Sequence, residues 1–215
     1  MSWYLGLYWG PSSEPASVEV SANQVWDSLA MLRDELGCAS SWSSGDVILD
    51  GADSLATALA TGVHTKDTTG EVIPTLGQTI GIQSLDQHDL VVNVSVGGSA
   101  DTWTGVFVCQ TRLLANLDRS RAGRLLGRLV EIWCPAHAAL TTSQLRRAGW
   151  QAGLSKKGPA AGWLTWVSPD LHDPLPGPVE ELGGGRLHVL APTADEATVD
   201  RVLHVLEGTG PTSTP

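Results

Sequence analysis

Residues 3–11 read WYLGLYWGP, and this aromatic stretch decides the fold class. Side chains alternate between the two faces of a β-strand, so the pattern predicts one face made of Trp3, Leu5, Leu7 and Trp9. The opposite face carries Tyr4 and Tyr8 with Gly6 between them, and a glycine there allows another backbone to approach closely. A stacking platform for sugars or bases is the alternative, but such platforms place charged or amide groups between the rings. We therefore predict a core strand that Gly10 and Pro11 end.

The composition around this strand predicts one globular domain. The chain has 215 residues, of which 42% are hydrophobic, and this is enough to bury a sizeable core. There is no apolar run long enough to cross a bilayer and no basic segment followed by a cleavage site, so we expect a cytoplasmic protein without membrane contact. We predict a single domain over residues 1–209 and a flexible tail over residues 210–215.

Hydrophobic periodicity predicts helices and strands in mixed order. The expected helices are one from Pro15 to Gly37, one capped by Asp53 and ended by Gly62, one from Arg121 to near Pro135, one capped by Thr142 or Ser143, and one from about Asp195 to Glu207. The expected strands are VIL at 47–49, then GQTIGIQSLD, LVVNVSVGG, TGVFVCQTRL, GWLTWVS and GRLHVLA. CASSWSSGD is predicted as a loop and GGG at 183–185 as a turn. This order favours an α+β fold with a largely antiparallel sheet and helices packed on it.

No pattern of catalytic or metal-ligating residues stands out in the chain. The three cysteines, Cys38, Cys109 and Cys134, are odd in number and lack C-x-x-C spacing, so we expect three buried free thiols and neither a disulfide nor a bound metal. His88 and His172 each precede an aspartate, but sequence neighbours in an extended chain point to opposite sides, and both are interpreted as surface residues. We predict no cofactor and no enzymatic activity.

The charge is distributed unevenly between the two halves of the sequence. Residues 1–110 contain 13 acidic and two basic residues, a net charge of −11, whereas residues 111–215 contain 10 acidic and 11 basic residues, a net charge of +1. An acidic surface repels nucleic acid, so direct DNA or RNA binding is not expected, while a basic protein partner would be attracted. Solubility alone is an equally good explanation of the charge.

Several blocks of the sequence resemble the immunity protein 52 family, in the order in which they occur in that family. They are YLGLYWGP at 4–11 followed by Glu14, IWCPAHAAL at 132–140, GWLTWVS at 162–168, LPGPVEELGGGRLHVLAP at 175–192 and VDRVLHVLEGTG at 199–210. The chain departs from the family pattern at Ser12, where a basic residue is expected, at Cys134, where an acidic one is expected, and at Trp166, which is usually Tyr. Residues 45–115 contain no matching block.

This resemblance implies an immunity protein that binds and blocks the cognate toxin of a bacterial polymorphic-toxin system in the cytoplasm. The family's toxins are often nucleases, and a carboxylate-rich surface can occupy a basic substrate groove. The partner-binding candidates are Asp46, Asp50, Asp53, Asp86 and Asp89, with Trp42 and Trp103 as aromatic anchors. The two tryptophans are equally well explained as core residues. Two alternatives remain open: a small-molecule or carbohydrate-binding domain using Trp42, Trp103 and Trp150, and an enzyme with an unrecognised active site.

Overall fold

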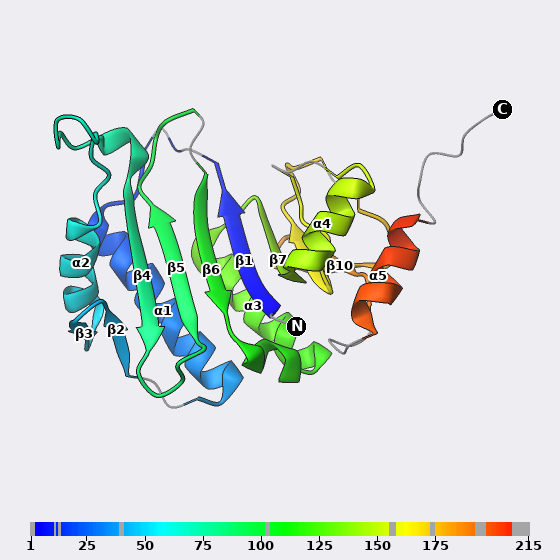
Figure 1. Cartoon of the computed structure of the whole chain (residues 1–215). Coiled ribbons are helices and arrows are strands. Elements are labelled where there is room, and N and C mark those ends of the chain that lie inside the picture. Colours follow the sequence, from blue (N-terminus) through cyan, green and yellow to red (C-terminus); the bar gives the residue numbers. More distant parts are fainter. Residues whose placement is uncertain are drawn as a thin grey trace.

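The aromatic strand lies near the middle of one long sheet (Figure 1). A computed structural model gives the structure and describes residues 3–10, 12, 14–38, 41–101, 104–154, 158–172, 175–191 and 197–207. Within these residues ten strands form a single antiparallel sheet, in the order β3-β2-β4-β5-β6-β1-β7-β8-β10-β9. The strands are β1 (Trp3–Trp9), β2 (Trp42–Ser44), β3 (Val47–Leu49), β4 (Gln78–Ser84), β5 (Val91–Val96), β6 (Gly105–Gln110), β7 (His137–Thr142), β8 (Leu164–Val167), β9 (Val179–Leu182) and β10 (Gly185–Val189).

Five α-helices and two short 3₁₀ helices accompany the sheet in the described part of the chain. They are α1 (Val18–Leu36), α2 (Ala52–Thr61), η1 (Pro74–Leu76), η2 (Arg112–Asn116), α3 (Arg119–Trp133), α4 (Ser143–Gln151) and α5 (Thr198–Glu207). In Figure 1, α1 and α3 lie behind β4, β5, β6 and β1, whereas α4 and α5 lie in front of the β7–β8–β10 end. The α+β fold predicted from the sequence is therefore confirmed.

The main core fills the space between the sheet and the two long helices. Leu5 and Leu7 of β1 are fully buried, and they belong to the same apolar cluster as Leu29 of α1 and Leu125 of α3. Trp9 is only partly buried, although its ring stacks on Trp133 with centroids 5.0 Å apart. One face of β1 thus lies in the centre of the core, as the alternation of its sequence predicts.

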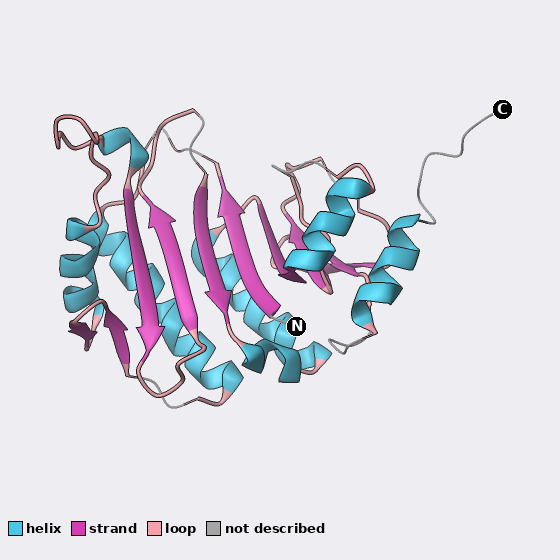
Figure 2. Ribbon diagram, in the orientation of Figure 1, coloured by secondary structure: helices cyan, strands magenta, loops and turns pink. Residues whose placement is uncertain are grey.

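The front face of β4, β5 and β6 carries no helix in the described part of the chain (Figure 2). Burial alternates along these strands: Ile80 and Ile82 of β4 are buried, and the residues that alternate with them, Thr79 and Gln83, are exposed. On β5, Asn93 is likewise exposed. This half of the sheet has one apolar face against α1 and one polar face directed away from it, which is usual for antiparallel sheets.

Several helix boundaries are set by caps that the sequence only partly indicated. Helix α1 begins at Val18 rather than near Pro15, because the Ser17 hydroxyl accepts a hydrogen bond from Val20 N at 3.3 Å. It ends where Gly37 adopts a left-handed conformation with φ of 66°, as predicted. Thr142 caps α4, also as predicted, by accepting a hydrogen bond from Leu145 N at 3.1 Å.

Other expectations are corrected by the structure. Asp53 does not cap α2, because the cap residue is Gly51 and the hydroxyl of Ser54 bonds the backbone there. Helix α3 begins two residues before Arg121, where the Asp118 side chain caps it. The predicted loop CASSWSSGD contains β2, and β7 and β9 were not anticipated as strands. Only Cys109 is a buried thiol, since Cys38 is half-buried and Cys134 is exposed.

Residues 183 and 184 form the predicted glycine turn, which joins β9 to β10. Both have positive φ, 55° and 75°, a conformation that glycine adopts without steric cost. The predicted strand end at Pro11, the start of the last helix at Asp195 and the tail over residues 210–215 lie outside the described residues. Among the described residues no helix combines the length and the apolar character needed to span a membrane.

Candidate functional site: an acidic sheet edge and an arginine–aromatic cluster

Strand β3 ends the sheet on one side and exposes apolar side chains at that edge. Val47 is 52% exposed and Ile48 is 65% exposed. Asp46 lies in the tight turn between β2 and β3, Asp50 follows β3, and Asp53 lies in the first turn of α2. An exposed apolar pair on an edge strand is unusual, because edges are a common site for pairing with another chain.

The three acidic side chains around β3 are available to solvent. Asp46, Asp50 and Asp53 are all exposed, and none forms a side-chain hydrogen bond or ion pair with another residue in the described part of the chain. The neighbouring backbone is fixed by Ser54, whose hydroxyl accepts hydrogen bonds from Asp50 N at 3.0 Å and Gly51 N at 3.2 Å. The β3 edge therefore exposes apolar side chains that are flanked by carboxylates without an internal ion pair in the described part of the chain. The hydrogen bonds of Ser54 fix the backbone next to them.

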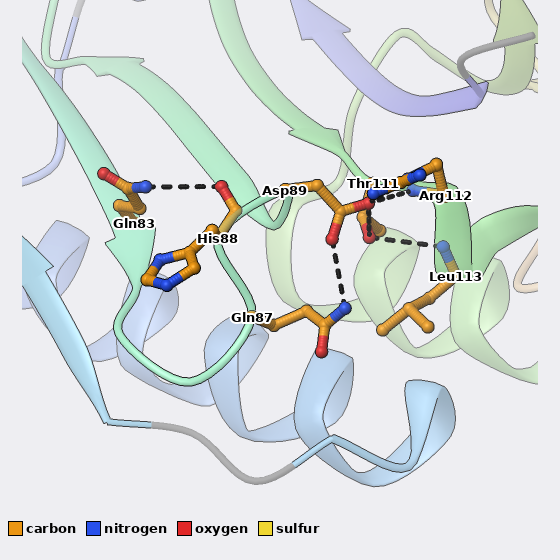
Figure 3. Close-up of polar contacts among 7 residues, drawn as sticks. All are labelled: Gln83, Gln87, His88, Asp89, Thr111, Arg112 and Leu113. Carbon is orange, nitrogen blue, oxygen red and sulfur yellow. Dashed lines mark hydrogen bonds and ion pairs between the residues drawn. The ribbon is translucent and has the colours of Figure 1, made fainter.

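The other two predicted aspartates, Asp86 and Asp89, accept hydrogen bonds that stabilise loops of the fold. The Asp86 carboxylate accepts a hydrogen bond from Ser41 N at 2.7 Å and thereby ties the β4–β5 loop to the start of β2. Asp89 accepts from Arg112 N at 2.9 Å and Arg112 Nε at 3.2 Å, and also from Thr111 and Gln87 (Figure 3). The backbone hydrogen bond from Arg112 is the main reason why the pKa of Asp89 is lowered.

The register of the strands shows which of the predicted acids lie at the same end of the sheet. Trp42 pairs with both Leu49 and Ser84. Asp50, one residue after Leu49, and Asp86, two residues after Ser84, therefore lie at the same end of the sheet, on the two strands that flank β2. Asp46 lies at the opposite end of the hairpin. Asp89 belongs to the connection between β4 and β5, and its charge is offset by Arg112. The predicted set is thus one edge group plus two residues that hold a loop.

The two predicted aromatic anchors, Trp42 and Trp103, are not found at the exposed edge of the sheet among the described residues. Trp42 is only 3% exposed and belongs to the core, in agreement with the alternative interpretation, so it offers no anchor surface to a partner. Trp103 lies outside the described residues. The exposed apolar side chains next to the acids are instead Val47 and Ile48, which the sequence analysis assigned to a short strand but not to the site.

A second constellation, which the sequence analysis missed, surrounds Arg146 of α4. Its guanidinium carbon lies 5.8 Å from the ring centroid of Tyr4, 5.9 Å from that of Tyr8 and 5.3 Å from that of Trp150. Burial raises the pKa of the Tyr4 phenol, and the nearby guanidinium partly offsets this rise. Gly6 makes the arrangement possible, because a Cβ there would lie 2.5 Å from the Tyr8 hydroxyl oxygen.

His137 of β7 completes this cluster. It is the cross-strand neighbour of Tyr8, and the two rings stack with centroids 4.9 Å apart. Burial, with a smaller contribution from the positive charge of Arg146, lowers the pKa of His137 to about 4, so the imidazole is neutral at pH 7. A pocket of about 230 Å³ opens beside these side chains, lined by Tyr8, Thr104, Val106, His137, Arg146, Trp150, Gly158 and Ala160.

The sequence contained one signal for this cluster. Tyr4 and Tyr8, the only tyrosines of the chain, lie on one face of the strand with Gly6 between them, and this was interpreted as a partly covered face. Both are half-buried, so that interpretation is confirmed. Nothing in the local sequence around Arg146 indicates that it reaches a strand 142 positions earlier.

The histidine–aspartate neighbours do not form acid–base pairs. Figure 3 shows the His88 imidazole directed away from Asp89, whose carboxylate is engaged by Arg112. His88 and His172 are exposed, as predicted. In the described part of the chain no three His, Cys, Asp or Glu side chains are grouped in a way that could hold a metal ion.

The sheet and its helices define a single-sheet α+β fold, which can be compared with known proteins. No known family model and no curated protein matches the sequence. The immunity protein 52 resemblance therefore stays a prediction. Among solved structures, the fold is similar to that of the Pseudomonas aeruginosa T6SS protein PA0821, with a TM-score of 0.51 and 12% sequence identity, covering 96% of this chain and 75% of that one. At this identity the similarity concerns the fold alone.

Proposed function

We propose that this chain is an immunity protein that binds one cognate toxin of bacterial competition through the β3 edge and neutralises it. The observation that carries the proposal is the exposed pair Val47 and Ile48 on an edge strand, flanked by Asp46, Asp50 and Asp53. A buried apolar centre with a charged rim is the usual anatomy of a protein–protein interface. The sequence blocks that resemble an immunity family and the fold similarity to a T6SS protein support the same role.

A nuclease is the toxin class that best fits this edge. A nuclease binds its polyanionic substrate in a basic groove, and three carboxylates that are not neutralised internally can occupy such a groove as phosphates do. The edge strand can in addition pair with an exposed strand of the partner, which adds backbone hydrogen bonds to the charge complementarity. Inhibition then follows from occlusion of the substrate groove.

The test replaces the rim charges and leaves the fold intact. The triple variant D46K/D50K/D53K is compared with D67K/E131K/D170K, which makes the same change in net charge at exposed acids away from β3. Each variant is co-expressed with the toxin encoded next to this chain, and survival of the host is scored. We expect the edge variant to lose protection and the control variant to keep it. Both should keep the thermal unfolding transition, because none of the replaced side chains has a hydrogen bond or ion pair within the described part of the chain.

A neutral substitution separates the apolar contact from the charge. Ile48→Ser removes an exposed side chain, so the fold should be unaffected, but affinity for the toxin should fall by about ten-fold if Ile48 is buried in the complex. Full protection by the folded edge variant, together with unchanged affinity of Ile48→Ser, would exclude the β3 edge as the binding surface. Failure of the wild-type chain to bind the toxin would refute the immunity role itself.

A further inference from the structure

The positive charge of Arg146 has no carboxylate partner in the described part of the chain. Its guanidinium lies over the rings of Tyr4, Tyr8 and Trp150, and burial raises the pKa of both Tyr4 and Tyr8, so both phenols are neutral at pH 7. The Nε atom of Arg146 is enclosed and has no hydrogen-bond partner among the described residues. A half-buried cation that lacks a counter-charge is costly, and binding an anion removes this cost.

His137 provides an independent indication of unused binding capacity in the same pocket. This side chain is only 7% exposed, lines the pocket, and its Nδ1 atom has no hydrogen-bond partner in the described part of the chain. Buried polar atoms are nearly always paired in native proteins, so two unpaired ones beside a single pocket need an explanation. A polar ligand that enters the pocket would supply one when the imidazole or the guanidinium turns toward it, because both atoms are covered in this structure.

We propose that this pocket is a binding site for a monocarboxylate carried on a small flat apolar body. The planar guanidinium of Arg146 can donate two parallel hydrogen bonds to a carboxylate, and Trp150 and Tyr8 can hold the apolar part between aromatic faces. Val106 and Ala160 contribute further apolar lining, and a volume of about 230 Å³ suits a single ring rather than a nucleotide. This site does not depend on the toxin role proposed for the β3 edge.

The charge of the pocket decides between a carboxylate and a phosphate. Arg146 is the one cation among the described lining residues, because the imidazole of His137 stays neutral at pH 7. A phosphate monoester carries close to two negative charges at this pH, and half of that charge would lack a partner in a partly dry pocket. A carboxylate carries one charge and is matched by one guanidinium.

A purely structural role for Arg146 makes a different prediction. Its contacts with Tyr4 and Tyr8 could serve only to hold α4 against β1, in which case no small anion would bind. Titration of the whole chain with benzoate, followed by calorimetry, distinguishes the two roles. Benzamide has nearly the same shape but no charge, so we expect it to bind roughly ten-fold more weakly or not at all. Equal binding of the two compounds, or no binding of benzoate, overturns the proposal without any variant.

Variants then place the binding at Arg146. We expect Arg146→Gln to weaken benzoate binding by roughly ten- to a hundred-fold, whereas Arg147→Gln, at an exposed neighbour on the same helix outside the pocket, should change it by less than about two-fold. Circular dichroism checks that both variants are folded. If Arg146→Gln is unfolded, Trp150→Ala tests the site through its exposed wall. Benzoate binding that is unchanged in a folded variant of this kind contradicts the proposal.

The same carboxylate chemistry can come from a free metabolite or from an acidic side chain of a protein. A blocked peptide with one Glu between two Leu residues is therefore titrated alongside benzoate. Tighter binding of benzoate assigns the pocket to a free carboxylate, and tighter binding of the peptide assigns it to a protein side chain. Both outcomes require benzoate to bind, and the absence of benzoate binding contradicts the proposal whatever the peptide does.

Discussion

At the scale of single residues, Asp89 illustrates how a carboxylate that was predicted for binding serves the fold. It accepts hydrogen bonds from Arg112 and Thr111, which follow β6, while it belongs to the loop before β5. We expect Asp89→Ala to lower the free energy of unfolding at pH 7 by about 1–3 kcal/mol, because backbone and side-chain donors lose a charged acceptor. Urea unfolding measures the change. Asp46→Ala, at an exposed acid without such contacts, should stay within about 0.5 kcal/mol of the wild type.

The pH dependence provides a control for this prediction. The pKa of Asp89 is lowered from its ordinary value of 3.8, chiefly by the Arg112 backbone hydrogen bond. A lowered folded-state pKa gives stability that is present above the unfolded-state pKa and is lost as the pH falls through the folded-state pKa. The difference between wild type and Asp89→Ala should therefore shrink below about pH 4. A difference that stays constant down to pH 2 would mean that the carboxylate charge contributes nothing.

At the scale of elements, the C-terminus of α3 contains a strained residue. Cys134 follows the last helical residue with φ of 41° and ψ of 54°, a left-handed conformation in which glycine is preferred. Its thiol is exposed and makes only a weak 3.9 Å contact with the Glu131 carbonyl oxygen. We expect Cys134→Gly to raise the free energy of unfolding by about 0.5–1 kcal/mol, since relief of the Cβ clash outweighs the added freedom of the unfolded chain.

Cys134→Ala is the matched control for that substitution, because it removes the thiol but keeps the Cβ atom. Chemical denaturation of both variants should place alanine near the wild type and glycine above it. If the alanine variant is as stable as the glycine variant or more stable, the gain does not come from the backbone conformation.

The elements that the sequence predicted well are those whose burial is one-sided. Helix α1 and strands β4 and β5 alternate between core and solvent, so their periodicity is visible. Strand β7 is buried at every position, because α4 covers the face opposite the main core, and it therefore shows no alternation. Strand β2 has the sequence WSS, and serine has a low preference for strands. Its pairing with β3 and β4 outweighs that preference.

At the scale of the whole molecule, the order of the strands in the sheet could not be predicted from the sequence. Strand β1 begins the chain and yet lies between β6 and β7, so its partners come from residues 96 to 139 positions later in the sequence. The acidic edge was predictable because Asp46, Asp50 and Asp53 are close in sequence around one hairpin and one helix start. The cluster of Tyr4, Tyr8, His137 and Arg146 was not, because it exists only through this strand order.

The charge asymmetry of the chain leads to the last prediction, which rests on the proposed toxin-binding role. Most of the excess negative charge belongs to residues 1–110, which build β1 to β6, α1 and α2, and the β3 edge is part of this half. Charges near an interface accelerate encounter, and dissolved salt screens them. We expect the association rate with the toxin to fall by about ten-fold or more between low salt and roughly 0.5 M salt.

The two charge-reversal variants decide whether this steering is local or global. In stopped-flow measurements, D46K/D50K/D53K should associate slowly at low salt and depend little on salt, because the nearest carboxylates have been reversed. D67K/E131K/D170K should behave nearly like the wild type, since its changes are not in β3, in the turn before it or in the first turn of α2, and salt screens charges outside the contact. Equal flattening of the salt dependence in both variants would show that net charge alone steers the partner. A wild-type rate that does not respond to salt would remove electrostatic steering from the mechanism, and the contact would then depend on Val47 and Ile48.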